Sequence, residues 1–251
     1  MRVIIEMDPP EHRGYRNVTS PVFTPRAMKA LDDLINTSAR ELVDKIIQDR
    51  RANPTGDLAS LLANGKINGE PMGPMETVGY YLITFSAGHD TTKNALVGGM
   101  RAFLDNPDQF KKLKQQPELV ESAVEEIVRW TSPVNHMKRT LTEDYALRGQ
   151  KMSAGDKLVM FYASANRDEE ISEDPFSFKI DRNPNRHLGF GIGEHFCLGA
   201  NLARRSQQAL WRELTRRMDW AELAGEPEQT HSAFVVGLKK LPIRYRIKPA
   251  A

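Results

Sequence analysis

The chain has 251 residues, of which 40% are hydrophobic and 27% charged, and its net charge is +2. This composition is that of a folded globular protein with one large core or two small ones, and the charge does not suggest a nucleic-acid partner. We find no apolar run of about eighteen residues to span a bilayer. Residues 1–16 do not look like a signal peptide, and a single cysteine excludes an internal disulfide, so we expect a cytoplasmic protein.

Helical spacing of apolar residues predicts most elements in the first half. A helix is predicted from about residue 25 to 48, and the stretch that follows, to Pro74, is punctuated by glycine and proline and predicts loops. One long helix is predicted from Met75 to about Leu104, before Asn106-Pro107 ends it. Two shorter helices, at 108–115 and 118–130, each open near a proline.

The second half changes its hydrophobic period. Residues 138–163 predict short strands with turns at Gly149 and Gly155, and residues 164–197 are predicted to be mostly irregular. A helix is predicted from about Leu198 to Met218, and strand-like pieces follow at 233–236 and 243–247. The helix has an apolar stripe made of Leu198, Leu202, Leu210 and Leu214. The predicted fold class is α+β, mostly α-helical.

The strongest chemical signal is the segment Phe190-Gly-Ile-Gly-Glu-His-Phe-Cys-Leu-Gly199. A thiolate metal ligand needs help to ionise, because a free cysteine has a pKa of about 8.5. A helix that begins directly after Cys197 supplies a positive dipole end and unpaired N–H groups. The glycines let the backbone turn tightly and approach a flat ligand closely. The alternatives are a cysteine buried as a small hydrophobic residue, or a glycine-rich turn in which the cysteine is incidental.

This segment resembles, position by position, the haem-binding loop of cytochromes P450: Phe, Gly, any, Gly, any, basic, any, Cys, any, Gly. The resemblance implies that Cys197 is the axial thiolate ligand of the iron of haem b, and that His195 reaches a haem propionate. It implies a shortened cytochrome P450 fold, with a long central helix packed on haem and small β-sheets. Residues 1–251 would then be one partial P450 haem domain. Further haem-binding positions implied by the resemblance are Phe190, Gly191 and Gly199.

The long predicted helix contains Ala87-Gly-His-Asp-Thr-Thr92. Glycine and threonine are poor formers of a helix interior and cost roughly half to one kcal/mol each. Gly88 leaves space for a flat group, Thr91 can turn its hydroxyl to a backbone carbonyl, and an acid beside a hydroxyl can pass protons through water. The alternative is a kinked, packed helix with a solvated Asp90. The stretch also resembles the oxygen-activation motif of the same family, which implies that Asp90 and Thr91 deliver protons to dioxygen and that Ala87 and Gly88 lie against haem.

Glu126 and Arg129 are spaced three residues apart on a predicted helix. Alone, such a pair is commonplace and contributes about 0.2–0.5 kcal/mol at a surface. The family carries this pair together with a later arginine, which Arg182 matches, and the resemblance implies a buried charge network that holds the cysteine loop. Haem propionates need cationic donors. The matching positions, each of which taken singly is more often a solvated surface cation, are His12, Arg16, Arg139 and His195.

The resemblance implies a haem-thiolate monooxygenase, an oxidoreductase that inserts one atom of O2 into a hydrophobic substrate. Soluble bacterial members take electrons from a ferredoxin that an NAD(P)H-dependent ferredoxin reductase supplies. A basic docking face for the ferredoxin, or else ordinary solvated helix charge, is formed by Lys111, Lys112, Lys114, Arg204 and Arg205. Three segments resemble members that hydroxylate sterols, terpenes, fatty acids or alkanes: residues 135–140, 165–169 and 199–204. The positions expected to face such a substrate are Phe85, Ala87, Val134, Asn135 and Val235.

Compared with the family, we expect the chain to lack the region before Asp8-Pro-Pro-Glu-His12 and the helices that roof the substrate pocket, which the family places after the position of residue 48. An open site favours association through its uncovered apolar face. Two alternatives therefore stand beside the monooxygenase. One is a haem-binding protein without monooxygenase turnover, acting as a carrier, a sensor or a weak peroxidase. The other is a degenerate chain that binds nothing.

Overall fold

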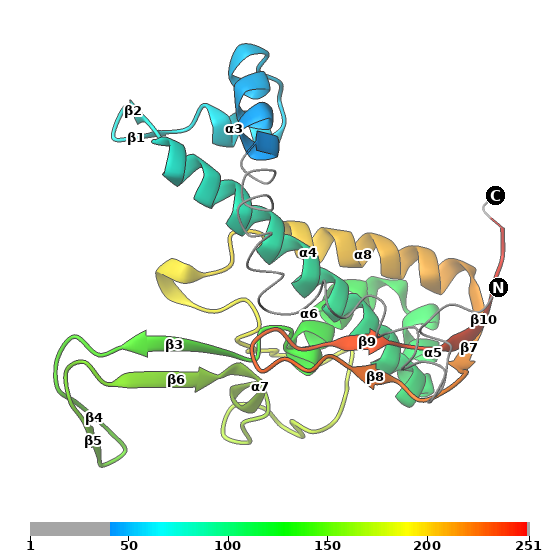
Figure 1. Cartoon of the computed structure of the whole chain (residues 1–251). Coiled ribbons are helices and arrows are strands. Elements are labelled where there is room, and N and C mark those ends of the chain that lie inside the picture. The colour runs from blue at the N-terminus through cyan, green and yellow to red at the C-terminus, as the bar shows by residue number, and fades with distance from the viewer. Residues whose placement is uncertain (1–40, 250–251) are drawn as a thin grey trace, which may run out of the picture. The chain divides into compact units, whose positions relative to one another are not determined.

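The computed structural model describes residues 41–249, which Figure 1 shows as helices and strands. The chain divides into two compact units, one up to Phe85 and one from Ser86 onward. Helix α4 (Pro74–Asp105) begins in the first unit and ends in the second, and it confirms the long helix predicted from Met75. The helix predicted from residue 25 is described from residue 41 and continues to residue 52. That residues 1–251 form one domain stays a prediction.

The first unit contains more regular structure than the glycine and proline residues predicted. Helix α3 (Leu58–Ala63) begins after Asp57, whose side chain accepts a 2.7 Å hydrogen bond from the amide of Ser60. Strands β1 (Lys66–Ile67) and β2 (Glu70–Pro71) form a hairpin around Asn68 and Gly69, whose φ angles are 54° and 88°. An Asn-Gly pair is the strongest short signal for such a turn. The stretch was predicted to be rich in loops, and the helix and strands within it are too short to show a hydrophobic period.

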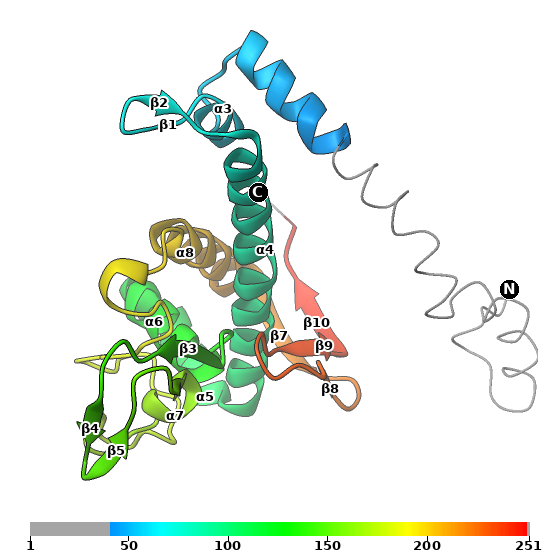
Figure 2. The ribbon, with the colours of Figure 1, turned by 60° about the vertical axis from the view of Figure 1, so that its left-hand side comes forward.

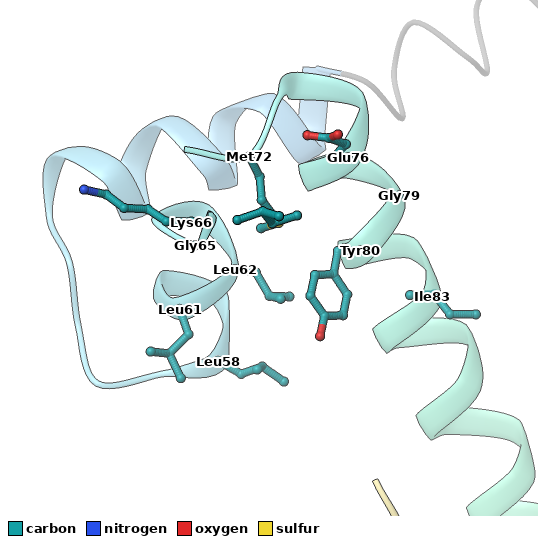
Figure 3. Close-up of a pocket in the computed structure, with 11 residues that line it drawn as sticks. Leu58, Leu61, Leu62, Gly65, Lys66, Met72, Glu76, Gly79, Tyr80 and Ile83 are labelled. Carbon is teal, nitrogen blue, oxygen red and sulfur yellow. The ribbon is translucent and has the colours of Figure 1, made fainter. Parts of the chain in front are cut away.

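A small core holds the first unit together. It consists of Ile47, Leu62, Ala63 and Tyr81, and the hydroxyl of Tyr81 donates a 2.5 Å hydrogen bond to the carbonyl of Ala59 in α3. A pocket of about 550 Å³ lies between α3 and the start of α4, and Figure 3 shows Leu62 and Tyr80 at its wall. Much of this unit's apolar surface stays exposed, for example 69% of Leu61.

The second unit is built on a group of helices. After α4 come α5 (Pro107–Gln115), the 3-10 turn η3 (Pro117–Leu119), α6 (Val120–Thr131) and α8 (Ala200–Arg217). Figures 1 and 2 both show α6 and α8 side by side. Proline occupies the start of α5 and of η3, where its missing N–H costs no hydrogen bond. The helices predicted at 108–115 and 118–130 are confirmed.

Trp211 of α8 is the centre of the core of the second unit and is fully buried. Its ring lies 4.9 Å from the ring of Phe103, measured between centroids. A Cβ atom at Gly99 would lie 2.9 Å from both Trp211 and Ile127, so this glycine allows α4 to approach them closely. The buried members of this core are Ala95, Ala102, Phe103, Leu113, Val120, Ala123, Val124, Ile127, Phe178, Ile180 and Trp211.

The leucine stripe predicted for α8 is confirmed only at Leu214, which packs against the core. Leu198 is 85% exposed and Leu202 is 70% exposed, whereas Gln207 and Trp211 are buried. The helix begins at Ala200, so Leu198 precedes it. The face of α8 turned to the core therefore carries Gln207, Trp211 and Leu214, whereas Leu198 and Leu202 are exposed and lie near Cys197 in the chain.

The strands pair into five two-stranded antiparallel sheets among the described residues. Strand β3 (His136–Thr140) pairs with β6 (Lys157–Phe161), and the hairpin of β4 (Tyr145–Leu147) with β5 (Gln150–Met152) follows β3 in the chain. Helix α7 (Tyr162–Ala165) follows β6. These strands confirm the predicted change of period and, with the helices, the α+β class.

The last two sheets lie near the end of the chain. Strand β7 (Met218–Leu223) pairs with β10 (Ile243–Ile247), and β8 (Glu228–Gln229) pairs with β9 (Leu238–Lys240). Of these, β10 was predicted, whereas β7 starts at the residue where a helix end was expected. The predicted strand at 233–236 is a single bridge between Val134 and Val235. Among the described residues, none of the helices has the length and apolar character that crossing a bilayer requires.

Replacing Trp211 with alanine is expected to lower the free energy of unfolding by about 3–5 kcal/mol, because the change leaves a cavity where α4, α6 and α8 meet. Trp220→Ala is the matched control, since Trp220 is 42% exposed on β7. It should cost about 1 kcal/mol or less. Urea unfolding followed by circular dichroism measures both changes, and equal losses would contradict this account of the core.

Candidate functional site

The cysteine loop joins the irregular segment after α7 to helix α8, as Figure 2 shows in yellow. Gly191 and Gly193 adopt φ angles of 71° and 74°, which favour glycine. The 3-10 turn η4 (Gly193–His195) follows, and the amide of Cys197 closes the loop by a 2.9 Å hydrogen bond to the carbonyl of Phe190. The sequence thus folds into a tight loop that presents Cys197 at the surface.

The start of α8 lies directly after this sulfur. Gly199 is the N-cap residue, and the amide of Ala200 donates a 3.2 Å hydrogen bond to the carbonyl of Cys197. The amides of Leu198 and Gly199 have no acceptor among the described residues. The loop therefore places two free backbone N–H groups and the start of a helix directly after Cys197 in the chain.

The middle of α4 shows the local geometry expected for its threonine. The Thr91 hydroxyl donates a 2.6 Å hydrogen bond to the carbonyl of Ala87, one turn earlier. Asp90 accepts a 2.7 Å hydrogen bond from Lys93, and this bond and the charge of Lys93 lower the Asp90 pKa. A Cβ atom at Gly88 would meet nothing within 4 Å, so open space lies beside the helix there.

The Glu-x-x-Arg pair is buried together with the later arginine. The side chains of Glu126 and Arg129 are fully buried, and that of Arg182 is 6% exposed. Arg129 donates to both carboxylate oxygens of Glu126, at 2.7 and 2.8 Å, and Arg182 donates at 3.0 Å. The remaining donors of Arg129 reach three carbonyls at 2.8 to 3.1 Å, those of Asn166, Pro175 and Ser177. The network therefore ties α6 to the irregular segment that leads to the cysteine loop.

A second group of charges, absent from the predicted site, lies beside this network. Glu125 of α6 accepts two hydrogen bonds from Arg204, at 2.6 and 2.8 Å, and pairs with a ring nitrogen of His187 at 3.0 Å. Asn166 is buried and accepts a 2.6 Å hydrogen bond from the amide of Leu188. No local pattern in the sequence marks Glu125, because its partners lie 62 and 79 residues away in the chain.

The positions expected to face a substrate come together in part. Val134 forms the bridge to Val235, and the amide of Asn135 donates a 2.8 Å hydrogen bond to the carbonyl of Phe234. Val134, Asn135 and Val235 all lie in the second unit. Phe85 is the last residue of the first unit and is 71% exposed.

Of the cations expected to bind propionates, two are described. Arg139 lies on β3 and His195 lies in η4, and both are exposed. His12 and Arg16 lie outside the described residues. The ferredoxin-docking face stays a prediction, and three of its five cations have partners within this chain. Lys112 pairs with Asp181 at 2.6 Å, Lys114 donates to the carbonyl of Asp219 at 3.0 Å, and Arg204 binds Glu125. Lys111 and Arg205 have no ion-pair partner within the part of the chain that the structure describes.

A family model described as Cytochrome P450 matches residues 55–247. The chain belongs to the cytochrome P450 family. It is 45% identical over 202 residues to the methyl-branched lipid omega-hydroxylase of Mycobacterium tuberculosis, a match that covers 80% of this chain and 47% of that protein. It is 40% identical over 218 residues to the steroid C26-monooxygenase of Mycolicibacterium smegmatis, covering 85% of this chain and 54% of that protein. The chain spans about half the length of the curated relatives it matches.

Solved structures confirm the P450 fold. The structure of CYP109E1 from Bacillus megaterium in complex with corticosterone aligns with a TM-score of 0.81 and 33% identity, covering 97% of this chain and 67% of that one. CYP108D1 from Novosphingobium aromaticivorans aligns with a TM-score of 0.76 and 34% identity, covering 98% of this chain and 76% of that one. The expected shortened P450 fold is therefore confirmed.

The cofactor of the P450 family is haem whose iron a cysteine thiolate binds. Several features of this P450 fit such a group. Cys197 is exposed, so a ligand can reach its sulfur. Large apolar residues lie on both sides of Cys197 in the sequence, and their side chains are exposed, as a flat apolar ligand would require. These are Ile192, Phe196, Leu198 and Leu202.

Replacing Arg129 with methionine is expected to cost this P450 about 3–5 kcal/mol of unfolding free energy, because Glu126 would remain buried without its main partner. Arg148→Met is the control, since Arg148 pairs with Glu170 while 79% of its side chain is exposed. That change should cost about 0–1 kcal/mol. Guanidinium unfolding compares the two variants, and a small loss in Arg129→Met would show that the buried network is not needed.

Proposed function

We propose that this chain carries the haem-binding part of a P450 monooxygenase and that Cys197 is the axial ligand. The observation that carries the proposal is the loop geometry: the sulfur is exposed, its backbone is closed onto Phe190, and a helix begins directly after it. When bound, the haem would supply the activation of dioxygen, which thiolate ligation favours. The family and the P450 names of the relatives support this assignment.

The remaining site residues have supporting roles in this proposal. Asp90 and Thr91 would hold and pass protons, since a carboxylate and a hydroxyl lie on adjacent residues of α4 and the hydroxyl is oriented by the Ala87 carbonyl. Ala87 and Gly88 would lie against the haem, because open space borders α4 at Gly88. Cationic donors for the propionates would be His12, Arg16, Arg139 and His195. Phe190, Gly191 and Gly199 would shape the loop around the sulfur.

We infer a hydrophobic substrate. Relatives are named for a methyl-branched lipid, for linalool and for a steroid, all of which are apolar molecules. The residues proposed to contact a substrate are Phe85, Val134, Asn135 and Val235, of which three are apolar. A sterol, terpene, fatty acid or alkane fits such a lining. Electrons would come from a ferredoxin and its NAD(P)H-dependent reductase, and because NAD(P)H is an intracellular reductant we propose a cytoplasmic location.

The ligand assignment predicts the spectrum of the haem-loaded chain. With dithionite and carbon monoxide, the wild-type chain should show the strongly red-shifted Soret band of a thiolate ligand, because the sulfur donates electron density to the iron. Cys197→Ser should lose this band. Retention of the band in the serine variant would disprove the assignment. A thiolate band without ferredoxin-driven hydroxylation would instead support the alternative of a haem-binding protein without monooxygenase turnover.

The proton role of Asp90 predicts a selective loss of turnover. Asp90→Asn should lower the hydroxylation rate by about a hundredfold or more, the usual contribution of a positioned acid or base, while the carbon monoxide spectrum stays unchanged. Asp105→Asn is the control, because Asp105 lies at the end of the same helix and pairs with Arg101 at 2.6 Å. Turnover is measured with a ferredoxin system and a linalool or steroid probe. A wild-type rate in Asp90→Asn would exclude the role.

A further inference from the structure

Two adjacent acids on α6 hold different parts of the chain. Glu126 binds Arg129 and Arg182 and accepts hydrogen bonds from the amide of Lys179 and from Asn185, so it holds the segment that precedes the cysteine loop. Glu125 instead binds His187 and Arg204. These two residues stand on either side of the cysteine loop, ten residues before the sulfur and seven after it. Glu125 therefore connects both ends of the cysteine loop to helix α6.

His187 is held in a defined way. Its side chain is 4% exposed, and its Nδ1 accepts a 3.1 Å hydrogen bond from the amide of Gly189. In the neutral ring the proton therefore lies on Nε2, which donates to Glu125 at 3.0 Å. The backbone at Gly189 is also pressed against α6, because a Cβ atom there would lie 2.4 Å from Val128. The entry to the loop is thus fixed on α6.

Arg204 follows the cysteine loop in the chain and reaches back to Phe190, the first residue of the loop. Its guanidinium lies 4.5 Å from the centroid of the Phe190 ring, within the range of a cation–π interaction. Phe190 also packs against Phe196, at 6.4 Å between centroids, and its carbonyl accepts the hydrogen bond from the amide of Cys197. A contact chain therefore runs from Glu125 through Arg204 and Phe190 to the backbone of the cysteine.

The charges in this group favour one another. Burial raises the Glu125 pKa, but hydrogen bonds from His187 and Arg204 lower it more strongly, to about 2. The hydrogen bond to Glu125 raises the Arg204 pKa, and the charge of Cys197 adds to that increase. Arg204 is 27% exposed, so its pair with Glu125 is partly shielded from water.

We propose that Glu125, Arg204 and His187 form a positioning brace that fixes Phe190 and, through it, the backbone of Cys197. The three are positioning residues, because they contact the loop rather than the sulfur. The brace as a structural device stands on the contacts alone, whereas its effect on an iron ligand rests on the proposed function. It also gives Arg204 a role other than docking a ferredoxin.

Amide hydrogen exchange of the haem-free, full 251-residue chain tests the brace without any cofactor. The reporters are the hydrogen-bonded amides of Gly191, Phe196 and Cys197. Arg204→Met should speed their exchange by about tenfold relative to wild type, because a two-pronged charge-assisted bond and the ring contact are both lost. Arg204→Lys keeps the charge but not the flat, two-pronged group, so its rates should lie between the two.

Glu125→Gln keeps the shape of the side chain and should speed the same amides, which guards against the case in which Arg204→Met does not fold. Arg216→Met is the matched control on the same helix, where Arg216 is 56% exposed and pairs with Glu213. It should leave the loop amides at wild-type rates. Unchanged loop exchange in both Arg204→Met and Glu125→Gln would overturn the brace. Equal acceleration in all parts of the chain would also overturn it, since that reports general destabilisation.

The carbon monoxide spectrum then separates the brace from the proposed function. In haem-loaded Arg204→Met, the red-shifted thiolate band should change to the band of a thiol or imidazole ligand faster than it does in wild type. Arg204→Lys should partly restore the thiolate band. If the wild type itself shows no thiolate band, the proposed function fails while the exchange result still decides the brace. If exchange accelerates but the thiolate band of Arg204→Met is as durable as that of wild type, positioning of the ligand is refuted.

Discussion

The buried carboxylate of Glu126 is the constraint on which the second unit depends. A fully buried charge is costly unless it is paired and hydrogen-bonded, and Glu126 meets this condition through two arginines and two further donors. Arg129 is buried too, and its donors reach carbonyls of a segment with little regular structure. That segment lacks the repeating hydrogen bonds of a helix or sheet, so the guanidinium supplies partners that its backbone would otherwise miss.

The same segment continues into the cysteine loop. Fixing the segment therefore also restricts the position of the Cys197 sulfur. Asn166 extends the connection, because its amide group accepts from Leu188 and donates to Ser132. Glu125 adds contacts to His187, which precedes the cysteine loop, and to Arg204, which follows it. Helix α6 therefore serves as a rigid support for a loop that has two glycines in left-handed backbone conformations and little packing of its own. An exposed cysteine that is held in place on such a loop suits a metal ligand.

Apolar surface remains exposed in both units, and it has a different meaning in each. Around Cys197 the exposed side chains lie next to a proposed ligand, and a flat apolar cofactor would cover them. In the first unit the exposed apolar residues line the pocket beside α3, together with Lys66 and Glu76. The relatives are about twice as long as the matched part of this chain, so the family places further structure beyond the residues matched here.

Local pattern was sufficient for the long helix α4, for α5 and α6, for the β3 to β6 region and for the cysteine loop, since helical period, proline position and glycine spacing act over a few residues. It failed where the deciding contacts are distant in sequence. The exposed leucines of α8, the short strands β7 to β9, and the pairing of Glu125 with Arg204 depend on which helices pack together. The sequence by itself determined the family, the haem ligand to expect and the elements that carry it. Only the tertiary structure decided which charges are buried as partners and which apolar faces are left open. Burial and ion pairing join residues far apart in the chain, such as Phe103 with Trp211 and Glu125 with Arg204, and no local period records such a separation.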